Sequence, residues 1–89
     1  MAKFEVLFEN SKGQKRVIGT AEEECEKLDI TYNFPKCNEI IKNFLAQYPH
    51  FKWYYTRKWI CPDGYMCLDV GSHTEFFYIR VAENEEKEK

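Results

Sequence analysis

The chain has 89 residues, with 13 Lys and Arg against 15 Asp and Glu, and a formal net charge of −2. This length predicts one domain, because neither half of a divided chain could shield a core from water. The charge balance gives no electrostatic argument for nucleic-acid binding, where a clear cationic footprint is expected. Because the sequence has neither a run of 18 apolar residues nor the pattern of a signal peptide, we expect a soluble, cytoplasmic protein without a membrane segment.

The N-terminal part of the sequence predicts a β-hairpin. Apolar and polar residues alternate from Lys3 to Glu9, which is the period of a half-buried strand. The residues from Asn10 to Gly13 favour a turn, and Gly13 is the one best able to adopt a positive φ. A second short strand, Lys15–Thr20, is expected to close the hairpin.

The next segment is strongly acidic, since residues 20–29 (TAEEECEKLD) carry five acids and one lysine. Thr20 and Glu23 have the spacing of a capping box, in which both side chains accept hydrogen bonds from backbone N–H groups at the start of a helix. We therefore expect a short acidic helix from Ala21 to about Leu28. Its glutamates would lie near the positive end of the helix dipole.

The clearest predicted element is an amphipathic helix from Phe34 to Tyr48. Asn33 can cap this helix, and Pro35 suits its first turn. Apolar residues recur at intervals of three and four and form one stripe, which consists of Phe34, Cys37, Ile40, Ile41, Phe44, Leu45 and Tyr48. We expect this stripe to cover one face of a sheet.

The C-terminal half predicts three strands, at 51–60 (FKWYYTRKWI), 65–70 (YMCLDV) and 75–81 (EFFYIRV). Turns are expected at Pro62-Asp63-Gly64 and at Gly71-Ser72-His73. Residues 83–89 (ENEEKEK) contain no apolar side chain and are expected to form a disordered acidic tail. The whole pattern predicts one α+β domain over residues 1–82, with an antiparallel sheet made from the N-terminal hairpin and a three-stranded meander.

The segment 51–60 combines five aromatic rings with three cations, and alternation divides them between the two faces of the sheet. The set with the heavier apolar load is expected to face the helix, and it consists of Phe51, Trp53, Tyr55, Arg57 and Trp59. The opposite face would then carry rings and cations from three neighbouring strands. These candidate binding residues are Lys52, Tyr54, Lys58, Tyr65, Phe76, Tyr78 and Arg80.

Several rings on an open sheet face exceed the scattered apolar surface of an ordinary monomer, and Tyr and Arg contribute strongly to protein interfaces. We therefore predict a small non-catalytic binding or regulatory protein whose partner is another protein, a second copy of itself included. One alternative is single-stranded nucleic acid, with bases stacked on the rings and phosphates on Lys52, Lys58 and Arg80. Another is that the N-terminal hairpin or the acidic helix covers this face, so that the rings only stabilise the sheet.

The sequence offers little for catalysis or metal binding. Its cysteines contain no C-x-x-C pair, so we expect thiols and no bound metal at Cys25, Cys37, Cys61 and Cys67. His50 follows the end of the predicted helix, and His73 lies in a predicted turn. No glycine-rich phosphate loop and no H-E-x-x-H, G-x-S-x-G or EF-hand pattern occurs. We therefore expect no enzymatic activity and no cofactor.

Overall fold

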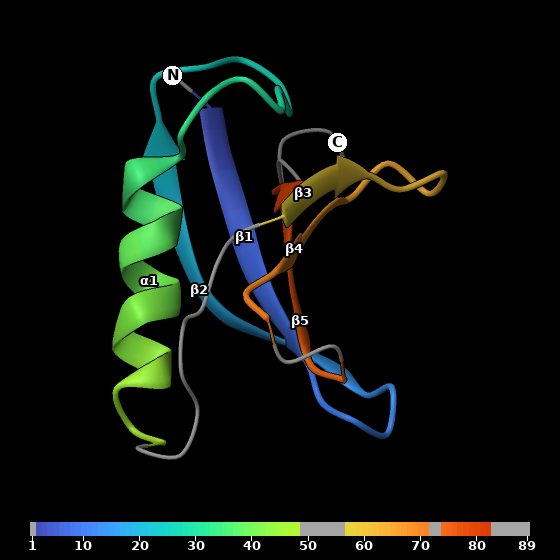
Figure 1. Ribbon diagram of the computed structural model, residues 1–89. Coiled ribbons are helices and arrows are strands. Elements are labelled where there is room, and N and C mark those ends of the chain that lie inside the picture. Colours follow the sequence, from blue (N-terminus) through green and yellow to red (C-terminus); the bar gives the residue numbers. More distant parts are fainter. Residues whose placement is uncertain (1, 49–56, 72–73, 83–89) are drawn as a thin grey trace, which may run out of the picture.

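The computed structural model describes residues 2–48, 57–71 and 74–82 (Figure 1). Within these ranges the chain forms, in order, β1 (Ala2–Glu9), β2 (Lys15–Glu23), α1 (Pro35–Leu45), β3 (Arg57–Ile60), β4 (Met66–Asp69) and β5 (Phe76–Val81). The predicted α+β class is confirmed. The start of the predicted strand at 51–60, the turn residues Ser72 and His73, and the predicted tail at 83–89 lie outside the described residues.

The strands form one antiparallel sheet in the order β2-β1-β5-β4-β3. The N-terminal hairpin and the C-terminal strands are joined along β1 and β5, where Val6 lies opposite Ile79. β1 therefore has a neighbour on each side. Among the described strands, β2 and β3 form the two edges of the sheet.

Two of the three predicted turns, those at Gly13 and Gly64, have the same construction. Gly13 donates its N–H to the carbonyl oxygen of Asn10 (2.9 Å), and Gly64 donates to that of Cys61 (2.9 Å). Both glycines have positive φ, 83° and 93°, which side chains larger than hydrogen rarely adopt. The turns are thus of the predicted kind, and they fix the register of the strands that they connect.

α1 covers one face of the sheet, over β1 and β2 (Figure 1). Pro35 lies in the first turn as predicted, whereas the helix ends at Leu45 rather than Tyr48. No helix in the described part of the chain is long and apolar enough to cross a membrane. The buried helix residues join a single core with the sheet, made of Phe4, Val6, Phe34, Cys37, Ile41, Phe44, Leu45, Met66, Leu68, Val70, Phe77 and Ile79.

The predicted cap of α1 at Asn33 is wrong. The N-cap residue is Phe34, which has φ 47° and makes no side-chain capping bond. The backbone N–H of Cys37 instead donates to Oε2 of Glu23 (2.7 Å), a buried carboxylate at the end of β2. An acceptor that is distant in sequence therefore satisfies one of the free N–H groups of the first helical turn.

The predicted acidic helix from Ala21 to Leu28 is also wrong. β2 continues to Glu23, which lies opposite Ala2 of β1, and the chain then bends without forming a helix. Pairing with β1 holds the residues from Thr20 to Glu23 in an extended strand, so no helix starts at their capping-box spacing. Tertiary pairing outweighs a local signal that is worth only about 1 kcal/mol.

Candidate interaction surface

The strand register divides the sheet's side chains into two faces, because residues directly opposite each other point to the same side. One face meets α1 and the core. We call the other the back face, and on it no helix lies among the residues that the structure describes (Figure 1). The back face comprises Lys3, Glu5, Leu7 and Glu9 of β1; Lys15, Val17, Thr20 and Glu22 of β2; Phe76, Tyr78 and Arg80 of β5; Tyr65, Cys67 and Asp69 in and next to β4; and Arg57 and Trp59 of β3.

The structure brings four of the predicted binding residues together on the back face. They are Tyr65, Phe76, Tyr78 and Arg80, and all four are half-buried. The rings of Tyr65 and Tyr78 meet edge to face, with centroids 6.1 Å apart. Two further predicted residues, Lys52 and Tyr54, lie outside the described residues.

The face assignment of β3 is wrong. Lys58 lies opposite Leu68 of the core, and its Nζ donates to the backbone oxygen of Tyr32 (3.2 Å) on the helix side. Trp59, which was expected against the helix, lies opposite Cys67 on the back face. The cause is the turn at Gly64, which sets Ile60 opposite Met66 of the core and so fixes which residues of β3 point inward. The number of large apolar side chains on each side of β3 did not indicate which side is buried.

The middle of the back face is a continuous row that crosses the whole sheet. We call it the central row; it takes one residue from each strand, in the order Val17, Leu7, Tyr78, Cys67 and Trp59. Leu7 and Cys67 are buried, whereas Val17 is 45% exposed and Trp59 is 37% exposed. The row is therefore accessible mainly at its two ends.

Arg80 connects three strands on one side of the central row. Its Nε donates to Oε1 of Glu5 (2.6 Å), and its Nη1 donates to the hydroxyl oxygen of Tyr65 (2.7 Å). The hydrogen bond to Glu5 raises the pKa of Arg80 above its ordinary value, with a smaller contribution from Tyr65. Charge-assisted bonds of this kind hold the guanidinium group in a defined position.

Tyr78, within the central row, is held in a similar way by two groups on the other side of the row, Glu9 and Lys15. Its hydroxyl donates to Oε1 of Glu9, and the ammonium group of Lys15 lies 4.6 Å from the centroid of its ring. Burial raises the pKa of the phenol, and the bond to Glu9 raises it further. Tyr78 is therefore a neutral hydrogen-bond donor at physiological pH, held between a carboxylate and a cation.

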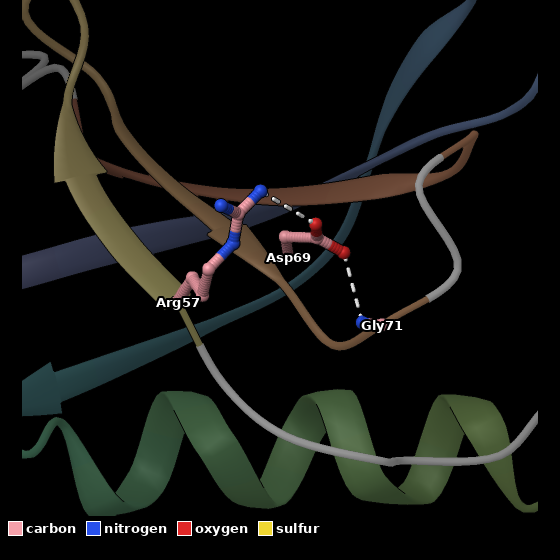
Figure 2. Close-up of polar contacts among 3 residues, drawn as sticks. All are labelled: Arg57, Asp69 and Gly71. Carbon is pink, nitrogen blue, oxygen red and sulfur yellow. Dashed lines mark hydrogen bonds and ion pairs between the residues drawn. The ribbon is translucent and has the colours of Figure 1, made fainter.

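The edge near β3 contains a buried acid (Figure 2). Oδ2 of Asp69 accepts from Nη2 of Arg57 (3.2 Å), and Oδ1 accepts from the backbone N–H of Gly71 (2.8 Å). The Asp69 side chain is 0% exposed, whereas that of Arg57 is 60% exposed. The guanidinium carbon of Arg57 also lies 5.6 Å from the ring centroid of Trp59, so the buried acid positions a cation beside the exposed indole.

Charges on the back face balance within the described residues. Four cations, Lys3, Lys15, Arg57 and Arg80, accompany four acids, Glu5, Glu9, Glu22 and Asp69. Arg57 and Arg80 form ion pairs, and the two lysines lie directly opposite acids on the neighbouring strand. A neutral face of this kind differs from the cationic groove expected for nucleic acid.

Sequence reasoning did not place the residues of β1, β2 and β3 on this surface. Glu5 and Glu9 were seen only as the polar side of a half-buried strand, and Lys15 was given no face, because nothing local indicates that β1 pairs with β5. Arg57 and Trp59 were assigned to the wrong face. The turn at Gly64 was the signal that could have placed them, because the alternation of Met66, Leu68 and Val70 in the next strand predicts that these aliphatic residues point inward.

The two buried thiols offer no activated nucleophile. Burial raises the pKa of Cys37 and of Cys67 to about 12, so both are protonated at neutral pH and react weakly. Among the described residues no group of three or more His, Cys, Asp and Glu side chains could hold a metal ion. His50 and His73 lie outside those residues. The expectation that the protein is not an enzyme stays a prediction.

The chain matches no protein-family model, no curated protein and no solved structure. Its function is therefore inferred from the chemistry of its own residues. On the back face these are aromatic rings, paired charges and an apolar row.

Proposed function

We propose that this protein is a small non-catalytic binding protein that docks another protein on its back face. The observation that supports this proposal is the central row, which is flanked by half-buried rings and crosses a face without a covering helix in the described residues. Aromatic side chains whose polar ends are already hydrogen bonded lose little conformational freedom on docking. They suit an interface better than flexible side chains would.

The chemistry of the surface also favours one kind of partner. The cations are paired with acids, so a highly charged partner would have to break bonds such as that between Arg80 and Glu5. A neutral protein surface with apolar residues at its centre can bury Trp59 and Phe76 and leave these pairs intact. The partner we propose is therefore a neutral, partly apolar protein surface rather than a polyanion.

Trp59 and Ile60 provide a matched test. They are neighbours in β3 with similar exposure, 37% and 46%, yet they lie on opposite faces of the sheet. A partner captured with the full chain and identified by mass spectrometry would be purified and titrated against Trp59→Ser and Ile60→Ser. We expect Trp59→Ser to weaken binding by roughly tenfold or more and Ile60→Ser to leave it within about twofold.

Two results would contradict the proposal. One is that both variants bind every captured partner as tightly as the wild-type chain does. The other is tight binding of a single-stranded oligonucleotide that weakens steeply with salt, which would favour the nucleic-acid alternative.

A further inference from the structure

The outer edge of β2 is the longest unpaired strand edge in the described part of the chain. β2 has nine residues and pairs with β1 on one side only. The other edge strand, β3, has four residues. A long open edge presents unpaired backbone N–H and C=O groups to any strand that can pair with them.

β2 also contains a β-bulge, which determines the face on which the side chains after it lie. The register with β1 shifts between Val6 and Leu7, so Ile18 is an extra residue in β2. As a result Lys15 and Val17 before the bulge, and Thr20 and Glu22 after it, all lie on the back face. Without the extra residue, the second pair would point to the opposite side.

The backbone groups of these four residues point to the open edge. Asn10 donates its N–H to the carbonyl oxygen of Gln14, which makes them a hydrogen-bonded pair, so the next residue, Lys15, directs its N–H and C=O away from β1. In a β-strand, residues whose side chains lie on the same face direct their backbone N–H and C=O groups to the same edge. Val17, Thr20 and Glu22 therefore direct their backbone groups outward as well.

Charge along this edge is self-complementary. Lys15 lies at one end of the outward-facing set and Glu22 at the other, with Val17 and Thr20 between them. If two copies of β2 pair antiparallel about a two-fold axis, Lys15 of each copy lies opposite Glu22 of the other, and Val17 lies opposite Thr20. All four residues then share one face of the joined sheet.

We propose that two copies of this chain pair along β2 and form a continuous ten-stranded sheet. The proposal goes beyond the function of the back face, because it uses the strand edge. Along one row of the joined sheet, Glu9 and Lys15 of one copy are followed by Glu22 and Lys3 of the other, so charges alternate in sign across the junction. Parallel pairing would place like charges together, and a shift by one residue would put opposite faces side by side.

The helices fit this arrangement. α1 contacts both β1 and β2, and it contacts β2 more extensively, so its axis lies nearer to β2. Two such axes related across the junction would be separated by at most about two strand spacings, roughly 10 Å, so the two helices would contact each other directly. The two copies of α1 would therefore lie side by side on one surface of the joined sheet, with both back faces on the other.

The bulge and the charges could also serve to discourage pairing, as they do on many edge strands. Here β2 carries a cation at one end, Lys15, and an acid at the other, Glu22. Antiparallel pairing of two copies neutralises both charges, so these charges favour self-pairing and do not discourage it. Lys15 would exchange its contact with the Tyr78 ring for the ion pair with Glu22. These two surface interactions are of similar strength, so the exchange leaves the backbone bonds and the burial of Val17 to stabilise the dimer.

Charge reversal tests the proposal with the full chain. Sedimentation equilibrium over a wide range of concentration should show a dimer for the wild type. Lys15→Glu and Glu22→Lys should each raise the dimer dissociation constant by roughly tenfold or more, since two pairs become repulsive by symmetry. An equimolar mixture of the two variants should form a dimer again, because at both ends of the junction a carboxylate of one variant then faces an ammonium group of the other. Lys12→Glu, at an exposed turn position, is the charge-matched control and should behave as wild type.

The same experiment can overturn the proposal in several ways. A wild-type chain that stays monomeric at every concentration would do so, as would a dimer that neither reversal weakens. A mixture that does not reassociate would show that the register is wrong. Thermal unfolding checks that each variant is folded. Loss of the dimer in Trp59→Ser but not in Glu22→Lys would place self-association on the back face, whereas failure of the partner test with an intact β2 dimer would affect the proposed function alone.

Discussion

Glu23 and Cys37 are joined by a 2.7 Å hydrogen bond from the backbone N–H of Cys37 to the carboxylate of Glu23. The bond connects the end of β2 to the first turn of α1. The hydroxyl of Tyr32 donates to the other carboxylate oxygen (3.2 Å), and the Glu23 side chain is 1% exposed. A residue of the sheet therefore replaces the side-chain cap that α1 lacks.

Removing this carboxylate should destabilise the protein strongly. We expect Glu23→Ala to lower the free energy of unfolding by about 2–3 kcal/mol, because it leaves the N–H of Cys37 buried without this acceptor and opens a cavity. Glu23→Gln retains an oxygen acceptor and should cost about 1 kcal/mol. Urea unfolding measures both, with Glu24→Ala at the neighbouring exposed position as the control. Equal effects of Glu23→Ala and Glu24→Ala would contradict the capping role.

The same segment shows where local sequence reasoning fails. The capping-box spacing of Thr20 and Glu23 predicted a helix, yet β1 offers this stretch a partner strand and Glu23 serves a different helix. The amphipathic helix, apart from its cap and its last residue, and the hairpin turns at Gly13 and Gly64 were predicted correctly, because their signals lie within a few residues of one another. Pairing between β1 and β5 had no such local signal.

Position 19 needs a glycine because α1 leaves no room for a Cβ atom, and not because the backbone there has a positive φ. A Cβ atom at this position would lie 2.9 Å from Cγ2 of Ile40, where α1 crosses β2. The side chain of Ile40 is branched at Cβ and cannot turn away easily. We expect Gly19→Ala to lower the free energy of unfolding by about 1 kcal/mol, since overpacking outweighs the gain in strand propensity.

A double-mutant cycle isolates this contact. In an Ile40→Ala background, which is itself less stable, Gly19→Ala should be neutral or slightly stabilising. Chemical unfolding of the four chains gives the coupling energy. An equal cost of Gly19→Ala in both backgrounds would show that the helix does not approach β2 as closely as the structure has it.

Asp69 and Arg57 should respond unequally to substitution, although they form one ion pair. Asp69 is buried and also accepts from Gly71, so Asp69→Ala should cost about 2–3 kcal/mol of unfolding free energy. Arg57 is 60% exposed, and Arg57→Ala should cost about 1 kcal/mol or less. Asp69→Asn keeps an oxygen for the Gly71 N–H and should fall between them. Similar losses for Asp69→Ala and Arg57→Ala in urea unfolding would contradict this asymmetry.

The residues of the candidate surface were predicted correctly in those strands whose buried face was identified correctly. Tyr65, Tyr78 and Arg80 were placed on the open face because their strands alternate with aliphatic residues that lie in the core. Lys58 was misplaced because β3 has large side chains on both faces, so apolar load could not indicate which face is buried. Only the register imposed by the turn at Gly64 decides between them.

Alkaline pH should destabilise the protein through its buried thiols. Burial raises the pKa of Cys37 and Cys67 from 9.0 to about 12 in the folded chain, so between these values the unfolded chain loses thiol protons that the folded chain retains. The unfolded state then binds fewer protons, and the free energy of unfolding falls as the pH rises through this window. Tyr78 contributes in the same direction, because burial and Glu9 raise its pKa above 10.0. Urea midpoints measured from about pH 8 to about pH 11 should therefore decline, and Cys67→Ala should reduce the slope although it lowers stability at every pH. An unchanged slope in Cys67→Ala would mean that this thiol ionises equally well in the folded chain.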